Sequence, residues 1–164
     1  MKIEKPSFWI GYFLDPEIGR GFVTPPMPQP YPPHLTILPP VPGEYDPDDG
    51  WGGVVSEFNP IKIGLRGIAW FGKNRDCEVR LTSRPRRLLR LHNALVQKAI
   101  ELYNYQPSQY KSFRPHFTLS ETDADPRSGD HFWINNLTIV QKLPDESHRA
   151  VDVLPLKNCA KIQL

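Results

Sequence analysis

Two short motifs of the same type lie about half the chain apart. The first is His34-Leu35-Thr36-Ile37, which follows Pro33, and the second is His116-Phe117-Thr118-Leu119, which follows Pro115. In an extended strand, residues two positions apart point to the same face, so each histidine would share a face with its threonine. The apolar residues would point to the opposite face, into a core. A single His-x-Thr sequence is common by chance, but a pair in the same apolar setting is not.

The residue types in these motifs suit proton transfer at a phosphorus centre. Histidine has an unperturbed pKa of about 6.5 and exchanges protons near neutral pH. One histidine can take a proton from water or a ribose hydroxyl while the other gives a proton to the leaving oxygen. Threonine hydroxyls can donate to the non-bridging phosphate oxygens. We therefore expect His34, His116, Thr36 and Thr118 to be catalytic, with no cofactor and no metal, and either histidine as the base.

The elements that would position these residues follow from hydrophobic periodicity and from turn residues. Proline-rich residues 25–33 exclude a helix or a central strand and predict an extended loop that leads to His34. Periodicity predicts one long helix between Ser83 and Asn104 and a short one over 51–58. Strands are predicted at 7–14, 34–38, 61–71, 77–82, 111–120 and 132–142, with one or two within 154–164.

The order of these elements indicates an α+β fold built on antiparallel sheets, because several connections have the length of hairpin turns. Each half of the chain has a similar series of strands around a helix. We therefore expect one domain over residues 1–164 that is bilobal and pseudo-duplicated, with flanking helices around a central cleft. The two motif strands would lie side by side across that cleft.

Composition describes an ordinary globular chain and limits its partners. The 164 residues carry a net charge of +2, which is too small to indicate a nucleic-acid coat protein or a binder of membrane surfaces. No apolar run approaches the roughly 20 residues that span a bilayer, and the N-terminus lacks the pattern of a signal peptide. We expect a cytoplasmic monomer with no membrane association.

The motifs in their context resemble a known family. Residues 33–40 (Pro-His-Leu-Thr-Ile-Leu-Pro-Pro) and 114–119 (Arg-Pro-His-Phe-Thr-Leu) resemble the paired signatures of the two-histidine (2H) phosphoesterase superfamily, in its 2′-5′ RNA ligase/cyclic phosphodiesterase (LigT-like) branch. The resemblance implies a bilobal α+β domain with both histidines in a central cleft. It also implies metal-independent opening or forming of cyclic phosphates, or cleavage of 2′-5′ phosphodiesters. The chain departs from the family where its proline-rich segment replaces a helix before the first motif.

Other residues are candidates for substrate binding, each with a structural alternative. Arg114 could clamp a phosphate or be an exposed surface arginine. Tyr12 and Tyr31 could stack on a base, although Tyr12 also suits the core. His92 lies in the long helix without a motif threonine, which favours a packing role. A basic run could contact RNA or be a solvated face; it comprises Arg80, Arg84, Arg86, Arg87 and Arg90.

Two functions of different classes fit these observations. The first is a phosphodiesterase acting on a 2′,3′-cyclic phosphate at an RNA end, on a 2′-5′ linkage, or on a cyclic nucleotide or oligonucleotide signal. Its setting could be RNA processing, nucleotide salvage, or viral destruction of a host's cyclic-nucleotide alarm. The second is a non-catalytic module that binds nucleotides or RNA on the same fold. Two intact proton-transfer motifs favour the enzyme, because binding alone does not need them.

Overall fold

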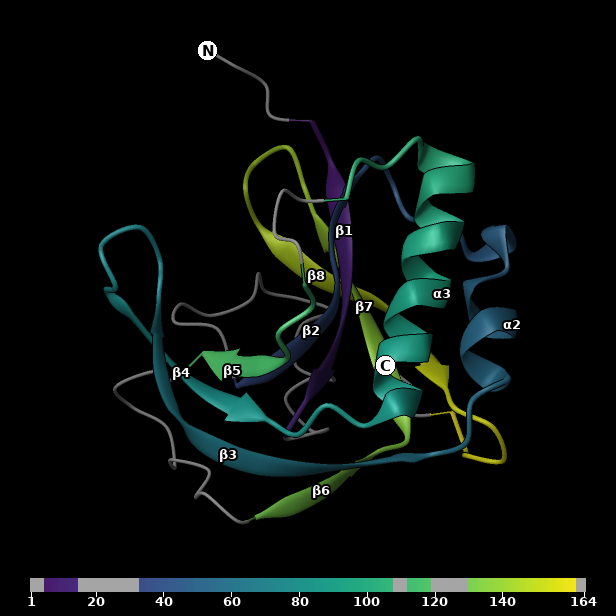
Figure 1. The fold of residues 1–164 in the computed structure, drawn as a ribbon. Helices are drawn as coiled ribbons and strands as arrows, with labels where there is room; N and C mark the ends of the chain where they lie inside the picture. The colour runs from purple at the N-terminus through teal and green to yellow at the C-terminus, as the bar shows by residue number, and fades with distance from the viewer. Residues whose placement is uncertain (1–4, 15–32, 108–111, 119–129, 162–164) are drawn as a thin grey trace.

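The computed structural model describes residues 5–14, 33–107, 112–118 and 130–161. Within these ranges the chain forms eight strands, two α-helices and a short 3-10 helix (Figure 1). In chain order they are β1 (Ser7–Phe13), β2 (His34–Pro42), η1 (Pro47–Asp49), α2 (Trp51–Ser56), β3 (Ile61–Phe71), β4 (Cys77–Thr82), α3 (Arg86–Tyr103), β5 (His116–Thr118), β6 (His131–Ile134), β7 (Asn136–Lys142) and β8 (His148–Pro155).

The strands form one curled antiparallel sheet in which the two motif strands are central neighbours. The order is β6-β3-β4-β5-β2-β1-β7-β8, so four strands lie on each side of the boundary between β5 and β2. These two groups are not the two halves of the chain, because β7 and β8 return to pair beside β1. The predicted α+β class and the placement of the motif strands side by side are confirmed.

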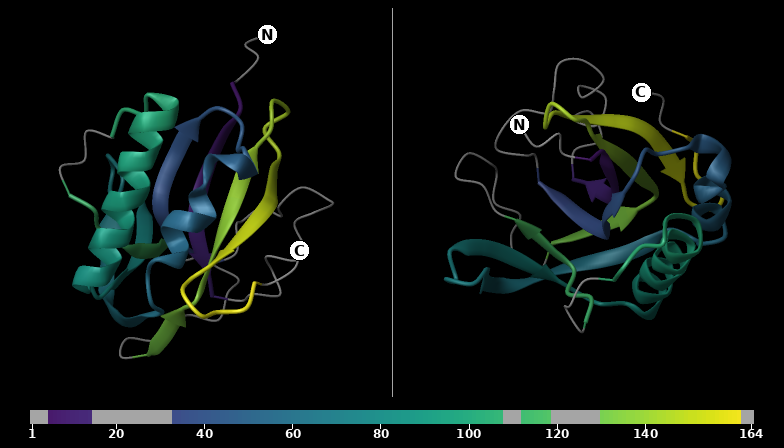
Figure 2. Two further views of the ribbon diagram at one scale, coloured as in Figure 1. Left: turned by 90° about the vertical axis from the view of Figure 1, so that its right-hand side faces the viewer. Right: turned by 90° about the horizontal axis from the view of Figure 1, so that it is seen from above.

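Both helices pack on the same face of this sheet (Figure 2). The apolar stripe of α3 is buried through Leu88, Leu91, Leu95 and Ala99, whereas Leu102 in the last turn is exposed. This stripe packs against apolar side chains from the central strands, among them Leu35 of β2 and Phe117 of β5. The apolar residue between each histidine and threonine therefore points into the core, as the alternation predicts.

Several predicted boundaries differ from the structure. The strand predicted at 34–38 continues to Pro42, through Pro39 and Pro40. Prolines are compatible with this stretch because its register with β1 shifts there, and because β5 pairs with β2 only near Leu35. The described strand β5 is only three residues long, and residues 119 and 120 of the predicted strand lie outside the described ranges.

The C-terminal region also differs from the prediction. Residues 132–142 form two strands, because the chain leaves its pairing with β3 after Ile134 and pairs with β8 from Asn136 and with β1 from Thr138. The last strand begins at His148, earlier than predicted. It follows a tight turn in which the Leu143 N–H donates to the Ser147 carbonyl at 2.8 Å and the Asp145 carboxylate accepts from the Ser147 N–H and hydroxyl.

Candidate active site

The register between β2 and β5 brings the two motifs together. Leu35 pairs with Phe117 in an antiparallel ladder, and both side chains are fully buried on the core face. Directly opposed residues share a face, so the flanking positions of both strands lie together on the other face. Antiparallel register then sets Thr36 beside His116 and His34 beside Thr118. His34, Thr36 and His116 are half-buried, and Thr118 is exposed.

The orientation of His116 is set by the main chain two residues before it. Its Nδ1 lies 2.7 Å from the carbonyl oxygen of Arg114. A carbonyl only accepts, so Nδ1 must carry the hydrogen, and Nε2 is the nitrogen left to exchange a proton with a substrate. The ring of Phe71 packs edge-on against the imidazole, with ring centroids 4.8 Å apart. The Arg114 guanidinium lies 4.7 Å from the centre of the same Phe71 ring.

His34 is held between two aromatic rings of β1. The centroid of its imidazole lies 4.8 Å from that of Trp9 and 5.5 Å from that of Phe13. Gly11, between these two aromatics, makes the arrangement sterically possible. A Cβ at Gly11 would lie 2.7 Å from the Trp9 ring and 2.9 Å from the Leu35 carbonyl oxygen, closer than real Cβ contacts come. The absence of a side chain at Gly11 therefore allows the Trp9 ring to lie across this glycine and contact His34.

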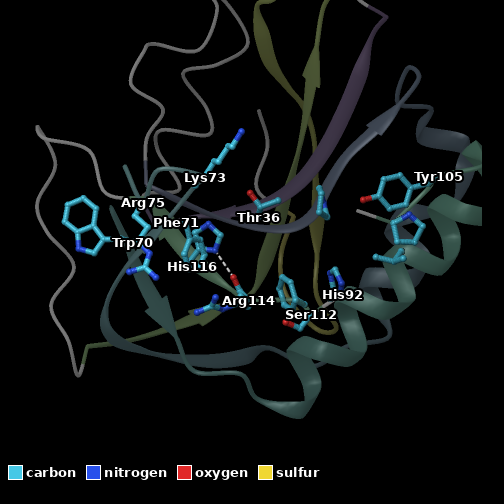
Figure 3. A pocket seen from close by; sticks show the side chains of 15 residues that line it. Thr36, Trp70, Phe71, Lys73, Arg75, His92, Tyr105, Ser112, Arg114 and His116 are labelled. Atoms are coloured by element: carbon cyan, nitrogen blue, oxygen red, sulfur yellow. Dashed lines mark hydrogen bonds between the residues drawn. The ribbon is translucent and has the colours of Figure 1, made fainter. Parts of the chain in front are cut away.

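A pocket of about 800 Å³ opens beside these motifs. Thr36 and His116 line it at its centre, and Figure 3 shows its two sides. One side is the tip of the β3–β4 hairpin, which supplies Trp70, Phe71, Lys73 and Arg75. The other side is formed by α3 and the chain on either side of residues 108–111, which supply His92, Val96, Tyr105, Pro107, Ser112 and Phe113. His34 and Thr118 are not among the described residues that line this pocket.

The pocket forms where β5 leaves β2. The chain that precedes His116 turns away from β2, and Phe113 stacks on the His92 ring at a centroid distance of 4.1 Å. His92 Nδ1 lies 2.7 Å from the carbonyl oxygen of Ile37, so the imidazole satisfies a main-chain acceptor that β5 does not reach. Burial lowers the pKa of His92, which favours the neutral ring. His92 thus contacts the segments that carry both motifs.

The predicted substrate-binding residues differ in their location relative to the pocket. Arg114 lines the pocket, although it precedes β5 and is not part of a strand. Tyr12 pairs with Leu35, faces the core, and stacks on Phe132 at 5.2 Å, so we do not propose it as a substrate contact. Tyr31 lies outside the described residues. In the basic run, Arg80 is buried and the other four arginines are exposed, and none of the five lines the pocket.

Sequence reasoning did not identify several residues that surround the motifs. No binding role was expected for the turn between the predicted strands at 61–71 and 77–82, yet its Lys73 and Arg75 line the pocket. The alternation of basic and small polar residues at a hairpin tip was a usable signal for anion binding. Tyr105 and His92 gave no such signal, because their place in the same pocket as Thr36 depends on how α3 packs against β2.

Two further structural observations concern the described residues. No three side chains of histidine, cysteine, aspartate or glutamate gather there in a way that could hold a metal ion. None of the helices found in the same ranges is both long and apolar enough to cross a membrane.

Two His-x-Thr motifs on adjacent central strands of a curled antiparallel sheet, with both helices on the core face, define a LigT-like α+β fold. The family model of the 2′-5′ RNA ligase superfamily matches residues 20–150. The chain belongs to this superfamily, which confirms its resemblance to the 2H phosphoesterases.

Solved structures with low sequence identity share the fold. TT0787 of Thermus thermophilus is 20% identical, with a TM-score of 0.62, and the match covers 92% of this chain and 98% of that one. A structure described as a phosphoesterase is 17% identical, with a TM-score of 0.61 and coverage of 94% and 100%. LigT of E. coli in complex with 3′-AMP is 18% identical, with a TM-score of 0.58 and coverage of 93% and 99%. No curated protein matches in sequence.

Proposed function

We propose that the protein is a metal-independent phosphodiesterase that acts on a nucleotide phosphodiester at His34 and His116. The observation that carries the proposal is the pairing of Leu35 with Phe117. This register gathers two imidazoles and two hydroxyls on one face of neighbouring strands. Proton transfer at both the attacking and the leaving oxygen requires two such groups, one for each.

The reaction needs one histidine neutral and the other protonated. The neutral ring takes a proton from water or a ribose hydroxyl as the oxygen forms its bond to phosphorus. The protonated ring gives its proton to the leaving oxygen as the old P–O bond breaks. Hydrolysis of a cyclic phosphate thereby consumes one water and leaves a phosphate monoester. Thr36 and Thr118 would donate to the non-bridging oxygens and keep attacking and leaving oxygens in line.

The surroundings of His116 support a phosphate-containing substrate. Lys73, Arg75 and Arg114 line the same pocket, and guanidinium groups suit the geometry of phosphate oxygens. Among structures of the same fold, E. coli LigT was solved with 3′-AMP, ATP and NADP+. A 2′,3′-cyclic phosphate at an RNA end, a 2′-5′ linkage and a cyclic oligonucleotide are the substrate classes to compare.

The test is hydrolysis by the purified protein, in EDTA, of nucleoside 2′,3′-cyclic phosphates, of 2′-5′ and 3′-5′ linked oligonucleotides, and of cyclic oligonucleotides. We expect activity without added metal and a bell-shaped dependence of kcat/KM on pH. His34→Ala and His116→Ala should each lower kcat by at least about 100-fold, since general acid–base catalysis contributes that much or more.

His131→Ala is the matched control, because His131 is an exposed histidine on β6 that does not line the pocket. It should retain wild-type kcat. Activity that disappears in EDTA and returns with a divalent metal would contradict the metal-free mechanism. Binding of these nucleotides by a wild-type protein that turns over none of them would instead support a nucleotide-binding module.

A further inference from the structure

Tyr105 presents its hydroxyl to the pocket. Its side chain is only 6% exposed, and its ring packs in the main core. No hydrogen bond joins this hydroxyl to another residue of the described ranges, and Tyr105 lines the same pocket as Thr36. Figure 3 shows the hydroxyl oxygen turned toward the pocket rather than toward α3. The Tyr105 hydroxyl is not among the buried side-chain atoms that lack a partner in the described ranges, so it can be reached from the pocket and is open to a ligand.

The chain holds this tyrosine in place at the end of α3. Asn104 adopts a left-handed conformation with φ of 51°, which ends the helix. The Tyr105 N–H then donates back to the Ala99 carbonyl at 3.3 Å and folds the residue over the last turn. The position of the hydroxyl is therefore set by the main chain and by core packing. Burial raises the pKa of Tyr105, so the hydroxyl keeps its proton and can both donate and accept.

His92 supplies a second directed polar group on the same side of the pocket. Its Nδ1 hydrogen is committed to the Ile37 carbonyl, and the face of its ring is stacked on Phe113. Only Nε2 is left for a ligand. In the neutral ring this nitrogen accepts a hydrogen bond and cannot donate one.

Charge is unevenly distributed between the two sides of the pocket. Three basic side chains line the pocket on the hairpin side. Lys73 and Arg75 belong to the β3–β4 hairpin, and Arg114 lies against Phe71 of that hairpin. The Tyr105 side has instead the apolar walls of Val96, Phe113 and Pro107. No lysine or arginine of the described residues lines the Tyr105 side, so a phosphate bound on that side would have no cationic partner. A flat ring with apolar faces and a polar edge matches both the walls and the two directed groups.

We propose that the Tyr105 side of the pocket is a nucleobase subsite, in which the Tyr105 hydroxyl and His92 Nε2 bind the polar edge of a base whose phosphate lies at Thr36 and His116. This inference rests on the proposed function for the position of the phosphate. It adds that the substrate is recognised through its base, not only through its phosphate and sugar.

Tyr105→Phe tests the subsite, because it removes the hydroxyl and keeps the ring in the core. Calorimetry would compare the binding of adenosine 3′-monophosphate with that of its base-free analogue, 1-deoxyribose 3-phosphate. We expect the substitution to weaken binding of the nucleotide by about tenfold, the loss of one well-placed hydrogen bond, and to leave binding of the base-free analogue unchanged. The nucleotides of guanine, cytosine and uracil would rank the preference of the subsite.

Tyr45→Phe is the matched control. It removes the 2.6 Å hydrogen bond from another tyrosine hydroxyl to Asp152, away from the pocket residues, and should leave nucleotide binding unchanged. Equal weakening for both ligands, no effect of Tyr105→Phe, or an equal effect of Tyr45→Phe would overturn the proposal. So would a wild-type protein that binds the two ligands equally well. Because binding needs no turnover, failure of the proposed hydrolysis would leave a positive result intact.

Discussion

The main chain and the side chain of Arg114 act on different parts of the site. Its carbonyl accepts from His116 Nδ1 and sets the orientation of the imidazole. Its guanidinium lies over the Phe71 ring and remains exposed at the edge of the pocket. Substitution of the side chain should therefore remove a cation without disturbing the carbonyl that orients the histidine.

We predict that Arg114→Ala raises KM by about tenfold, within the range of a charge-assisted hydrogen bond, while kcat changes little. The pH at which kcat is highest should stay the same, because the main-chain acceptor of His116 is kept. Arg114→Lys should recover only part of the loss, since an ammonium is not planar and cannot bind phosphate bidentately. Steady-state kinetics across pH would check these outcomes. A large fall in kcat with KM unchanged would show that Arg114 acts in the chemical step instead.

The β3–β4 hairpin is the element that completes the pocket. Its strands pair from Leu65 with Thr82 outward to Phe71 with Cys77, and the turn beyond them carries Lys73 and Arg75 to the motif strands. These side chains are exposed, so they act through charge in a strongly solvated setting. Long-range attraction of this kind depends on ionic strength.

We predict that binding of a single-stranded oligonucleotide weakens with salt and that Lys73→Ala and Arg75→Ala each reduce this dependence. Each phosphate contact on single strands contributes about 0.7 to the slope of log K against log salt. Lys157→Ala removes the same charge from an exposed position outside the pocket and serves as the control. Fluorescence titrations at several salt concentrations would measure the slopes. Unchanged slopes in both hairpin variants would place the nucleic-acid strand elsewhere.

Two half-buried histidines couple the stability of the whole molecule to pH. His92 lies on α3 and contacts the Ile37 carbonyl of the central strand β2, and His148 begins β8 at one edge of the sheet. Burial lowers the pKa of both, and Lys142 adds to the effect at His148. The unfolded chain therefore binds more protons than the folded one as pH falls through the ordinary histidine pKa. Their contribution is fully present above about pH 6.5 and is lost below it.

We predict a lower melting temperature at pH 5.5 than at pH 7.5. His92→Gln, which cannot take up a proton in this range, should lower the melting temperature at pH 7.5 by losing the stacked ring. It should also reduce the difference between the two pH values. Differential scanning calorimetry of the wild type and of His92→Gln and His148→Gln would test this. Equal pH dependence in all three proteins would show that other groups control it.

The parts of the fold that were predictable from sequence are those set by local pattern. The strands at 61–71 and 77–82 have the predicted bounds, because clean alternation and the turn between them specify a hairpin. Helix α3 follows from its apolar stripe and ends at Tyr103, with Asn104 as its C-cap. The path through Pro39 and Pro40 was not predictable. It depends on which edge of β2 is left unpaired, and that is decided by β5 from far along the chain.

The sequence by itself determined the chemistry of the candidate site, because two His-x-Thr motifs with alternating apolar residues specify which side chains share a strand face. It did not determine what surrounds that face. Lys73, His92 and Tyr105 reach the pocket only through the twist of a hairpin and the packing of a helix on β2. Tyr12 faces the core for the same reason. Contacts between distant residues follow from strand register and tertiary packing, which no local pattern encodes.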